Sequence, residues 1–272
     1  MLRRIMSVFL ICILTASLFP GYIVEAAAIE FTDAIQKQLN ATAERATGSN
    51  QSKLTKQFND LKSEQQQTMS WDDKISSLRY ANEAKTSETR KRINDIDKDK
   101  IRRLEDQLQS AKNKYQPLFN TYTALNKQIA TTKKLKDKTL AKMLQTQADS
   151  MKLMVTLGKQ DIKNKQNALT AAKKAKTSKA TKVRSILAEI EPIKSRIKAD
   201  KSAISNPNKL MQTEWKNFKA AIKAQEPART ADTLSRLVTL SGQILSKKKS
   251  IYQYEVKIED IIKRANTELT RS

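Results

Sequence analysis

The chain has 272 residues, with 52 lysines and arginines, 28 aspartates and glutamates, and a formal net charge of +24 at pH 7. It has no histidine and only one cysteine, so the side chains that most often act as general bases, nucleophiles and transition-metal ligands are almost absent. No glycine-rich phosphate loop or nucleophile elbow occurs either. We therefore expect a protein that is not an enzyme and that carries no cofactor or metal.

The first 28 residues have the pattern of a secretory signal peptide. Two arginines precede an apolar run over residues 5–19, a Pro-Gly pair follows it, and three alanines then supply the small residues needed for cleavage. The run is shorter than the roughly 20 residues that a membrane span requires. We predict cleavage near Ala26 or Ala28, giving a secreted, extracellular or cell-wall-associated protein without a membrane span. Because Cys12 lies in the signal segment, the processed chain would form no disulfide.

Composition predicts helix throughout the rest of the chain. Only three glycines remain after the signal segment, and Ala, Lys, Gln, Leu and Glu fill most positions. Thr32 is a candidate cap for a short helix, and Gly48-Ser49-Asn50 breaks the pattern. Residues 29–50 are thus predicted to form a short N-terminal helix and a break, and residues 51–272 a long-helix coiled-coil region. Ser70, followed by Trp and two aspartates, predicts a further helix start.

Two clusters that resemble ligand sites have plainer interpretations. Asp95, Asp97 and Asp99 are spaced like the start of a calcium loop, but a lysine follows where the loop needs glycine, which favours a solvated helix face. The three methionines within residues 143–154 have helical spacing and are predicted to be core residues. Gly158 weakens the same helix and could act as a hinge.

Apolar residues recur at alternating steps of three and four, the heptad pattern of a coiled coil. A stripe this narrow must pack against another helix of the same chain or of a second copy. We therefore predict an all-α fold, an elongated antiparallel coiled coil or long-helix bundle with no sheet, with possible homo-oligomers through the heptad seams. The four seams cover residues 104–129, 183–204, 211–222 and 237–269.

Prolines and turn-forming residues predict where these helices end. Residues 205–208 and 225–227 each combine a proline with turn formers and are predicted breaks. Pro117 and Pro192 lie inside intact heptad runs, so kinks are expected there in place of helix ends.

The point where the chain reverses direction has two candidates. Residues 177–181 are preferred, because they separate an Ala/Lys-rich stretch from an isoleucine seam, and residues 130–132 compete with them. With the first choice, a helix of some 60 to 100 residues would be roughly 90–150 Å long.

Residues 131–182 carry nearly half of the net charge, with fourteen lysines, three aspartates and no arginine. Lysines on a solvated helix bind anionic polymers through counterion release, and the lack of arginine favours diffuse electrostatics over bidentate recognition. No aromatic residue occurs between Tyr122 and Trp215, so no ring is available for stacking a nucleic-acid base. The predicted polyanion-binding residues are Lys133, Lys134, Lys136, Lys138, Lys142, Lys173, Lys174, Lys176, Lys179 and Lys182.

These lysines predict a partner with repeating negative charge. The preferred hypothesis is an adhesin or scaffold that binds an anionic cell-wall polymer of the teichoic-acid type. One alternative is a purely structural, self-associating coiled coil whose charge only maintains solubility, and another is non-specific binding to the backbone of extracellular DNA. Membrane penetration is not expected, because Leu135, Leu140 and Met143 do not form a broad apolar face.

Overall fold

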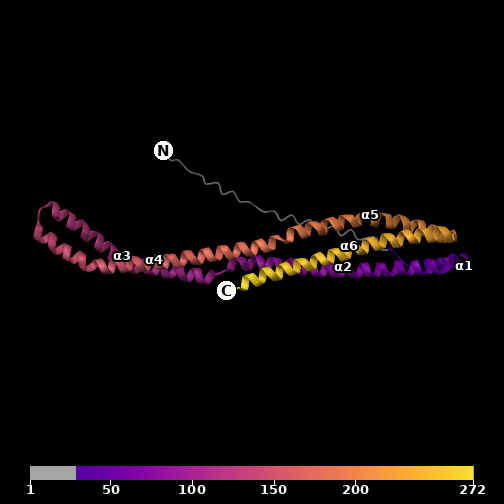
Figure 1. Cartoon of the computed structure of the whole chain (residues 1–272), viewed down its shortest axis with the longest axis horizontal. Helices are drawn as coiled ribbons and strands as arrows, with labels where there is room; N and C mark the ends of the chain where they lie inside the picture. Colours follow the sequence, from indigo (N-terminus) through magenta and orange to yellow (C-terminus); the bar gives the residue numbers. More distant parts are fainter. Residues whose placement is uncertain (1–28, 272) are drawn as a thin grey trace, which may run out of the picture. The chain divides into compact units, whose positions relative to one another are not determined.

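The computed structural model describes residues 29–271, about 92% of which are helical, and these residues contain no strand (Figure 1). The predicted all-α fold without a sheet is therefore confirmed. The predicted signal peptide, residues 1–28, lies outside the described residues. The helices are α1 (Asp33–Glu44), α2 (Asn50–Asp95), α3 (Lys98–Lys134), α4 (Lys138–Ala188), α5 (Ile190–Lys223) and α6 (Pro227–Thr270).

The chain divides into two compact units, and α2, α5 and α6 each contribute residues to both. Unit 1 comprises residues 29–62 and Ser205–Ser241. Unit 2 comprises Ser63–Ile204 and residues 242–271.

Unit 1 is organised around an aromatic core. Phe218 is fully buried and stacks on Trp215 and on Phe58, with ring centroids 5.0 and 6.0 Å apart. Phe31 packs edge-on against Phe58 and Trp215, which ties the chain before α1 to this core. The third predicted seam is confirmed, since Met211 packs against the same cluster and Ile222 belongs to it.

The boundaries of α1 follow the predicted signals. The Thr32 side chain accepts a hydrogen bond from the Ile35 N–H at 3.3 Å, as expected of an N-cap. Gly48 has φ +62°, a left-handed conformation that glycine adopts without strain, and α2 begins two residues later.

A second predicted break, at residues 225–227, is also confirmed. Gln225 has φ +55°, and its N–H donates to the Ile222 carbonyl while the Glu226 N–H donates to the Ala221 carbonyl. This pair of bonds is a Schellman motif, which terminates α5. Pro227 then occupies the first position of α6, where its missing N–H costs nothing.

The predicted break at residues 205–208 is wrong, because α5 continues through Pro207 to Lys223. Ile204 before the proline and Trp215 after it are both buried. Burial of the apolar stripe on either side thus compensates for the one helical hydrogen bond that the proline removes.

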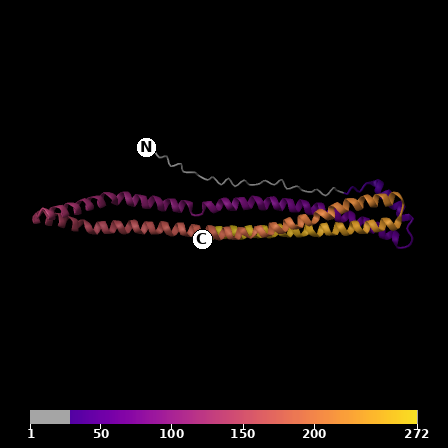
Figure 2. The same cartoon turned by 90° about the horizontal axis from the view of Figure 1, so that it is seen from above.

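Within unit 2, α3 and α4 form an antiparallel hairpin, and Figures 1 and 2 both show them side by side. Leu125 and Ile129 near the end of α3 pack against Ala148 near the start of α4. Farther from the turn, Glu105 forms an ion pair with Lys173 at 2.6 Å. The predicted seam over residues 104–129 is confirmed, since each of its positions is buried or half-buried.

The preferred reversal point at residues 177–181 is wrong. Helix α4 passes through it unbroken, and Ala180 and Val183 are buried there, so the apolar stripe gives the chain no reason to turn. The reversal lies at residues 135–137, just beyond the competing site at residues 130–132.

Three further helix boundaries differ from the sequence expectation. Helix α2 runs through Ser70 without a new start, and α2 and α3 meet at residues 96–97, where Asp97 has φ +50°. At Pro192 the expected kink is a one-residue interruption, because α4 ends at Ala188 and α5 begins at Ile190. The carbonyl of Ala188 is the one whose i+4 partner is the proline, which has no N–H to donate.

Candidate functional site

Five of the predicted lysines gather at the reversal between α3 and α4. All five are exposed, and within residues 29–271 their side chains form no ion pair or side-chain hydrogen bond. They occupy the last turn of α3, the connection and the first turns of α4. These turn lysines are Lys133, Lys134, Lys136, Lys138 and Lys142.

The backbone of the reversal is closed by hydrogen bonds that involve the turn lysines themselves. Lys136 has φ +58°, and its N–H donates to the Lys133 carbonyl at 3.2 Å. The Asp137 N–H donates to the Thr132 carbonyl at 3.3 Å, which completes a Schellman motif. The chain therefore turns over a few residues and places five ammonium groups around one end of the hairpin.

Little negative charge opposes these lysines. Asp137 is the one carboxylate among residues 133–142, and its side chain accepts a hydrogen bond from the Leu140 N–H at 3.0 Å as the N-cap of α4. The positive end of the α4 dipole lies beside the negative end of the α3 dipole at this turn, so the ammonium groups supply the net charge. The reversal therefore carries a local excess of positive charge, with five lysines against the single carboxylate of Asp137 in residues 133–142.

The other five predicted lysines lie elsewhere, beginning about 45 Å farther along α4. Four of them bind other parts of unit 2. Two of them form ion pairs, Lys173 with Glu105 at 2.6 Å and Lys182 with Glu268 at 2.8 Å. Two donate hydrogen bonds to backbone carbonyls, Lys176 to Asn94 at 3.1 Å and Lys179 to Arg271 at 2.5 Å. The fifth, Lys174, is exposed. The structure therefore separates the predicted residues into an exposed cluster and a group that mainly holds helices together.

Exposed apolar residues beside the reversal were missed by the sequence interpretation. Met143 and Met154 were predicted to be core residues, but they are 66% and 52% exposed, so that prediction is wrong for both. Met151 is half-buried against the Leu125 cluster, as predicted. The signal was available in the spacing, because residues 141, 144, 148, 151 and 155 form the buried stripe and Met143 and Met154 fall outside it.

No exposed aromatic ring accompanies the turn lysines. Tyr122 is the nearest aromatic residue in sequence, and it is half-buried against Leu125, Ile129 and Ala148. The geometry therefore suits a ligand held by charge and offers no platform for stacking bases.

Gly158 does not form a hinge in the structure. It is buried inside unbroken α4, and a Cβ atom at this position would lie 2.8 Å from Tyr115 Cδ1 and 3.2 Å from Phe119 Cζ. The glycine instead allows the Tyr115 ring to pack directly on the α4 backbone.

Unit 2 also contains a buried carboxyl group, Glu255, with 4% of its surface exposed. The Asn82 amide nitrogen donates to Glu255 Oε2 and to the Glu255 backbone carbonyl, each at 2.9 Å. Burial raises the pKa of Glu255, against the lowering effects of the Asn82 hydrogen bond, Lys201 and Arg79. Burial likewise lowers the pKa of Lys201. The group is buried and interrupts the apolar stripe of α6, so we interpret it as a structural polar layer.

Glu255→Gln is expected to stabilise the protein at pH 7. Because the pKa of Glu255 is raised, the folded state binds a proton at this carboxyl group more tightly than the unfolded state does. The stability that the protonated carboxyl group contributes is therefore lost as the pH rises through the folded-state pKa. The gain from Glu255→Gln should thus be largest at neutral pH and shrink toward pH 4. Thermal denaturation at both pH values measures this, and an equal gain at each pH would contradict the assignment.

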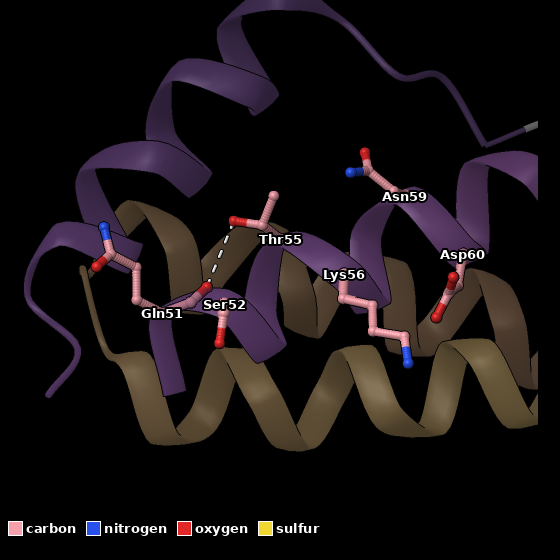
Figure 3. A pocket seen from close by; sticks show the side chains of 6 residues that line it. All are labelled: Gln51, Ser52, Thr55, Lys56, Asn59 and Asp60. Carbon is pink, nitrogen blue, oxygen red and sulfur yellow. Dashed lines mark hydrogen bonds between the residues drawn. The ribbon is translucent and has the colours of Figure 1, made fainter. Parts of the chain in front are cut away.

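The surface of unit 1 has an open depression on α2, but its geometry does not suit catalysis. Figure 3 shows that its polar side chains splay to different sides of the helix and do not converge on a common point. Thr55 simply donates to the Gln51 carbonyl one turn earlier, at 3.4 Å. The lining residues are Gln51, Ser52, Thr55, Lys56, Asn59 and Asp60.

Residues 29–271 provide neither a metal-binding cluster nor a membrane-spanning helix. No group of three or more histidine, cysteine, aspartate or glutamate side chains in this range could hold a metal ion. None of the helices in the same range combines the length and apolar character needed to cross a bilayer. Comparison of the chain with protein-family models, curated proteins and solved structures finds no match. The chemistry of the turn lysines is therefore the basis for assigning a function.

Proposed function

We propose that the protein is exported and that its turn lysines bind a repeating-phosphate polymer of the cell envelope, so that it acts as an adhesin or scaffold. One observation carries this proposal: five exposed, unpaired lysines surround the α3–α4 reversal, and the single carboxylate among them is engaged as a helix cap. The long helices then serve to present this charged end.

The binding mechanism is counterion release. An anionic polymer that carries one phosphate per repeat is surrounded by condensed cations, and each lysine that replaces one of them releases it into solution. Lysine ammonium groups on flexible stems suit this role, since they need no fixed geometry from the polymer. Affinity should therefore be high at low salt and fall steeply as salt rises.

The sequence favours a polymer outside the cell over nucleic acid inside it. A predicted signal peptide precedes the helical region, and no exposed ring is available at the reversal to bind bases. A teichoic-acid-type polymer fits these constraints, whereas extracellular DNA would be held only by its backbone.

A fourfold lysine substitution tests the proposal. Changing Lys133, Lys134, Lys136 and Lys138 to glutamine should lower the affinity for poly(glycerol phosphate) at low salt by roughly tenfold to a hundredfold, and should flatten the dependence of log K on log salt by about 3. The substitution at position 136 keeps the turn, because Gln225 adopts the same left-handed conformation in the other Schellman motif. Isothermal titration over a series of salt concentrations measures both quantities.

A matched control removes the same charge from unit 1. Lys37, Lys53, Lys56 and Lys62 are exposed and form no ion pair with other described residues, so their change to glutamine should leave affinity nearly intact. Equal losses in both variants would overturn the assignment of the site. Tighter binding to duplex DNA than to the envelope polymer would favour the alternative of non-specific binding to extracellular DNA. If the protein bound neither polymer, the alternative of a purely structural coiled coil would stand.

A further inference from the structure

The start of α4 carries apolar side chains that nothing in unit 2 covers. Leu135, in the reversal itself, is 76% exposed. The remaining members lie on α4 and are called here the apolar flank: Leu140, Met143, Leu153, Met154 and Leu157, with exposed fractions between 43% and 67%.

The apolar flank consists of two groups on one face of α4, and this face is distinct from the packed seam. Leu140 and Met143 are three residues apart, as are Met154 and Leu157, and the two pairs are separated by about three helical turns. Residues 141, 148 and 155 form the buried stripe against α3. The hairpin therefore has a second exposed face on α4 that carries two apolar groups within about 25 Å, separated by the polar residues Thr146, Gln147 and Ser150.

Charge decides which kind of partner would cover the apolar flank. Residues 133–159 contain seven lysines and two aspartates, of which Asp137 caps α4 and Asp149 accepts a hydrogen bond from Gln145. A second copy of the chain would bring like charges together along this face. A soluble phosphate polymer would neutralise the lysines and leave the apolar flank in water. An anionic lipid bilayer satisfies both, because its headgroups meet ammonium groups and its acyl boundary takes up apolar side chains.

We propose that the end of the α3–α4 hairpin lies flat on the surface of an anionic bilayer. The apolar flank enters the boundary between headgroups and acyl chains, while the lysine stems extend to the headgroup phosphates. The sequence expectation against penetration considered Leu135, Leu140 and Met143 alone, and the exposed Leu153, Met154 and Leu157 extend that surface. The contact is interfacial, in keeping with the lack of a membrane-spanning helix among residues 29–271. This inference shares the turn lysines with the proposed function and otherwise rests on the apolar flank.

The test is cosedimentation with vesicles made of equal amounts of phosphatidylglycerol and phosphatidylcholine. The triple variant Leu140→Ser, Met143→Ser, Met154→Ser should lose at least about tenfold in vesicle partitioning, while its affinity for soluble poly(glycerol phosphate) stays the same. The control is Met69→Ser, Tyr80→Ser, Leu210→Ser, which removes three other side chains that are 45–59% exposed and should bind vesicles like the unmodified chain.

Each outcome separates this inference from the proposed function. Vesicle binding that survives the triple variant would overturn the role of the apolar flank, even where the fourfold lysine variant abolishes polymer binding. Equal binding to vesicles of phosphatidylcholine alone would also overturn it, because the anionic headgroups would then be unnecessary. If the unmodified chain self-associates and the triple variant is a monomer, a second copy of the chain covers the apolar flank and the bilayer proposal is overturned.

Discussion

Phe218→Ala is expected to destabilise unit 1 by about 3–5 kcal/mol. Phe218 is fully buried, and its ring stacks between Trp215 and Phe58 with centroid distances of 5.0 and 6.0 Å. Removing the ring leaves a cavity that the surrounding helices cannot collapse to fill, because α2 and α5 are fixed there by other buried side chains such as Leu54 and Ile222.

Urea denaturation followed by tryptophan fluorescence measures this loss. A Trp71→Phe background makes Trp215 the sole tryptophan, and Trp215 lies in the affected core. Leu210→Ala is the matched control, because Leu210 lies on the same helix with 45% of its surface exposed and should cost about 1 kcal/mol or less. A loss at Phe218 no larger than at Leu210 would contradict the assignment of this core.

Two glycines inside helices are expected to respond to alanine with opposite signs. At Gly158 the new Cβ would lie 2.8 Å from Tyr115 Cδ1 and 2.9 Å from Tyr115 Cγ. Rotation of the ring about its Cβ–Cγ bond leaves Cγ in place, so it cannot relieve this contact. Overpacking of about 1–3 kcal/mol should exceed the gain of roughly 1 kcal/mol in helix propensity. At Gly242 the nearest atom is Glu64 Oε1 at 3.8 Å, so Gly242→Ala should stabilise by about 0.5–1 kcal/mol.

Amide hydrogen exchange locates the two effects. Gly158→Ala should lower protection in the α3–α4 hairpin around Tyr115, whereas Gly242→Ala should leave the hairpin unchanged and raise protection in α6. Stabilisation of the hairpin by Gly158→Ala would show that α3 and α4 do not approach each other closely at this point.

Composition and apolar spacing were sufficient to predict an all-helical chain and two of its buried stripes. The seam over residues 104–129 and the stripe through Trp215 are packed as the heptad pattern requires. Helix ends were harder to predict, because glycine is absent from several residues that adopt a left-handed conformation at a turn. Lys136, Gln225 and Asp97 adopt left-handed conformations that usually favour glycine, whereas Gly158 and Gly242 lie inside continuous helices.

Only part of the candidate site could be predicted from the sequence. Local lysine density identified residues 131–182, but density alone cannot distinguish a lysine exposed at the turn from one paired across helices. Lys173 and Lys182 find carboxylate partners 68 and 86 residues away in the chain, Glu105 and Glu268, and such partners become visible only once the fold brings helices together. The exposed Met143 and Met154 were misassigned for a different reason, because their helical spacing was noted without checking it against the stripe through residues 141, 144, 148, 151 and 155.

Lysine footprinting tests the central claim most directly. The protein is acetylated with and without saturating poly(glycerol phosphate) at low salt, and the modification of each lysine is quantified by mass spectrometry. Protection should be several-fold greater at the turn lysines than at Lys37, Lys53, Lys56 and Lys62, and should disappear as salt is raised. Uniform protection of all exposed lysines, or protection centred on residues 173–182, would contradict binding at the α3–α4 reversal.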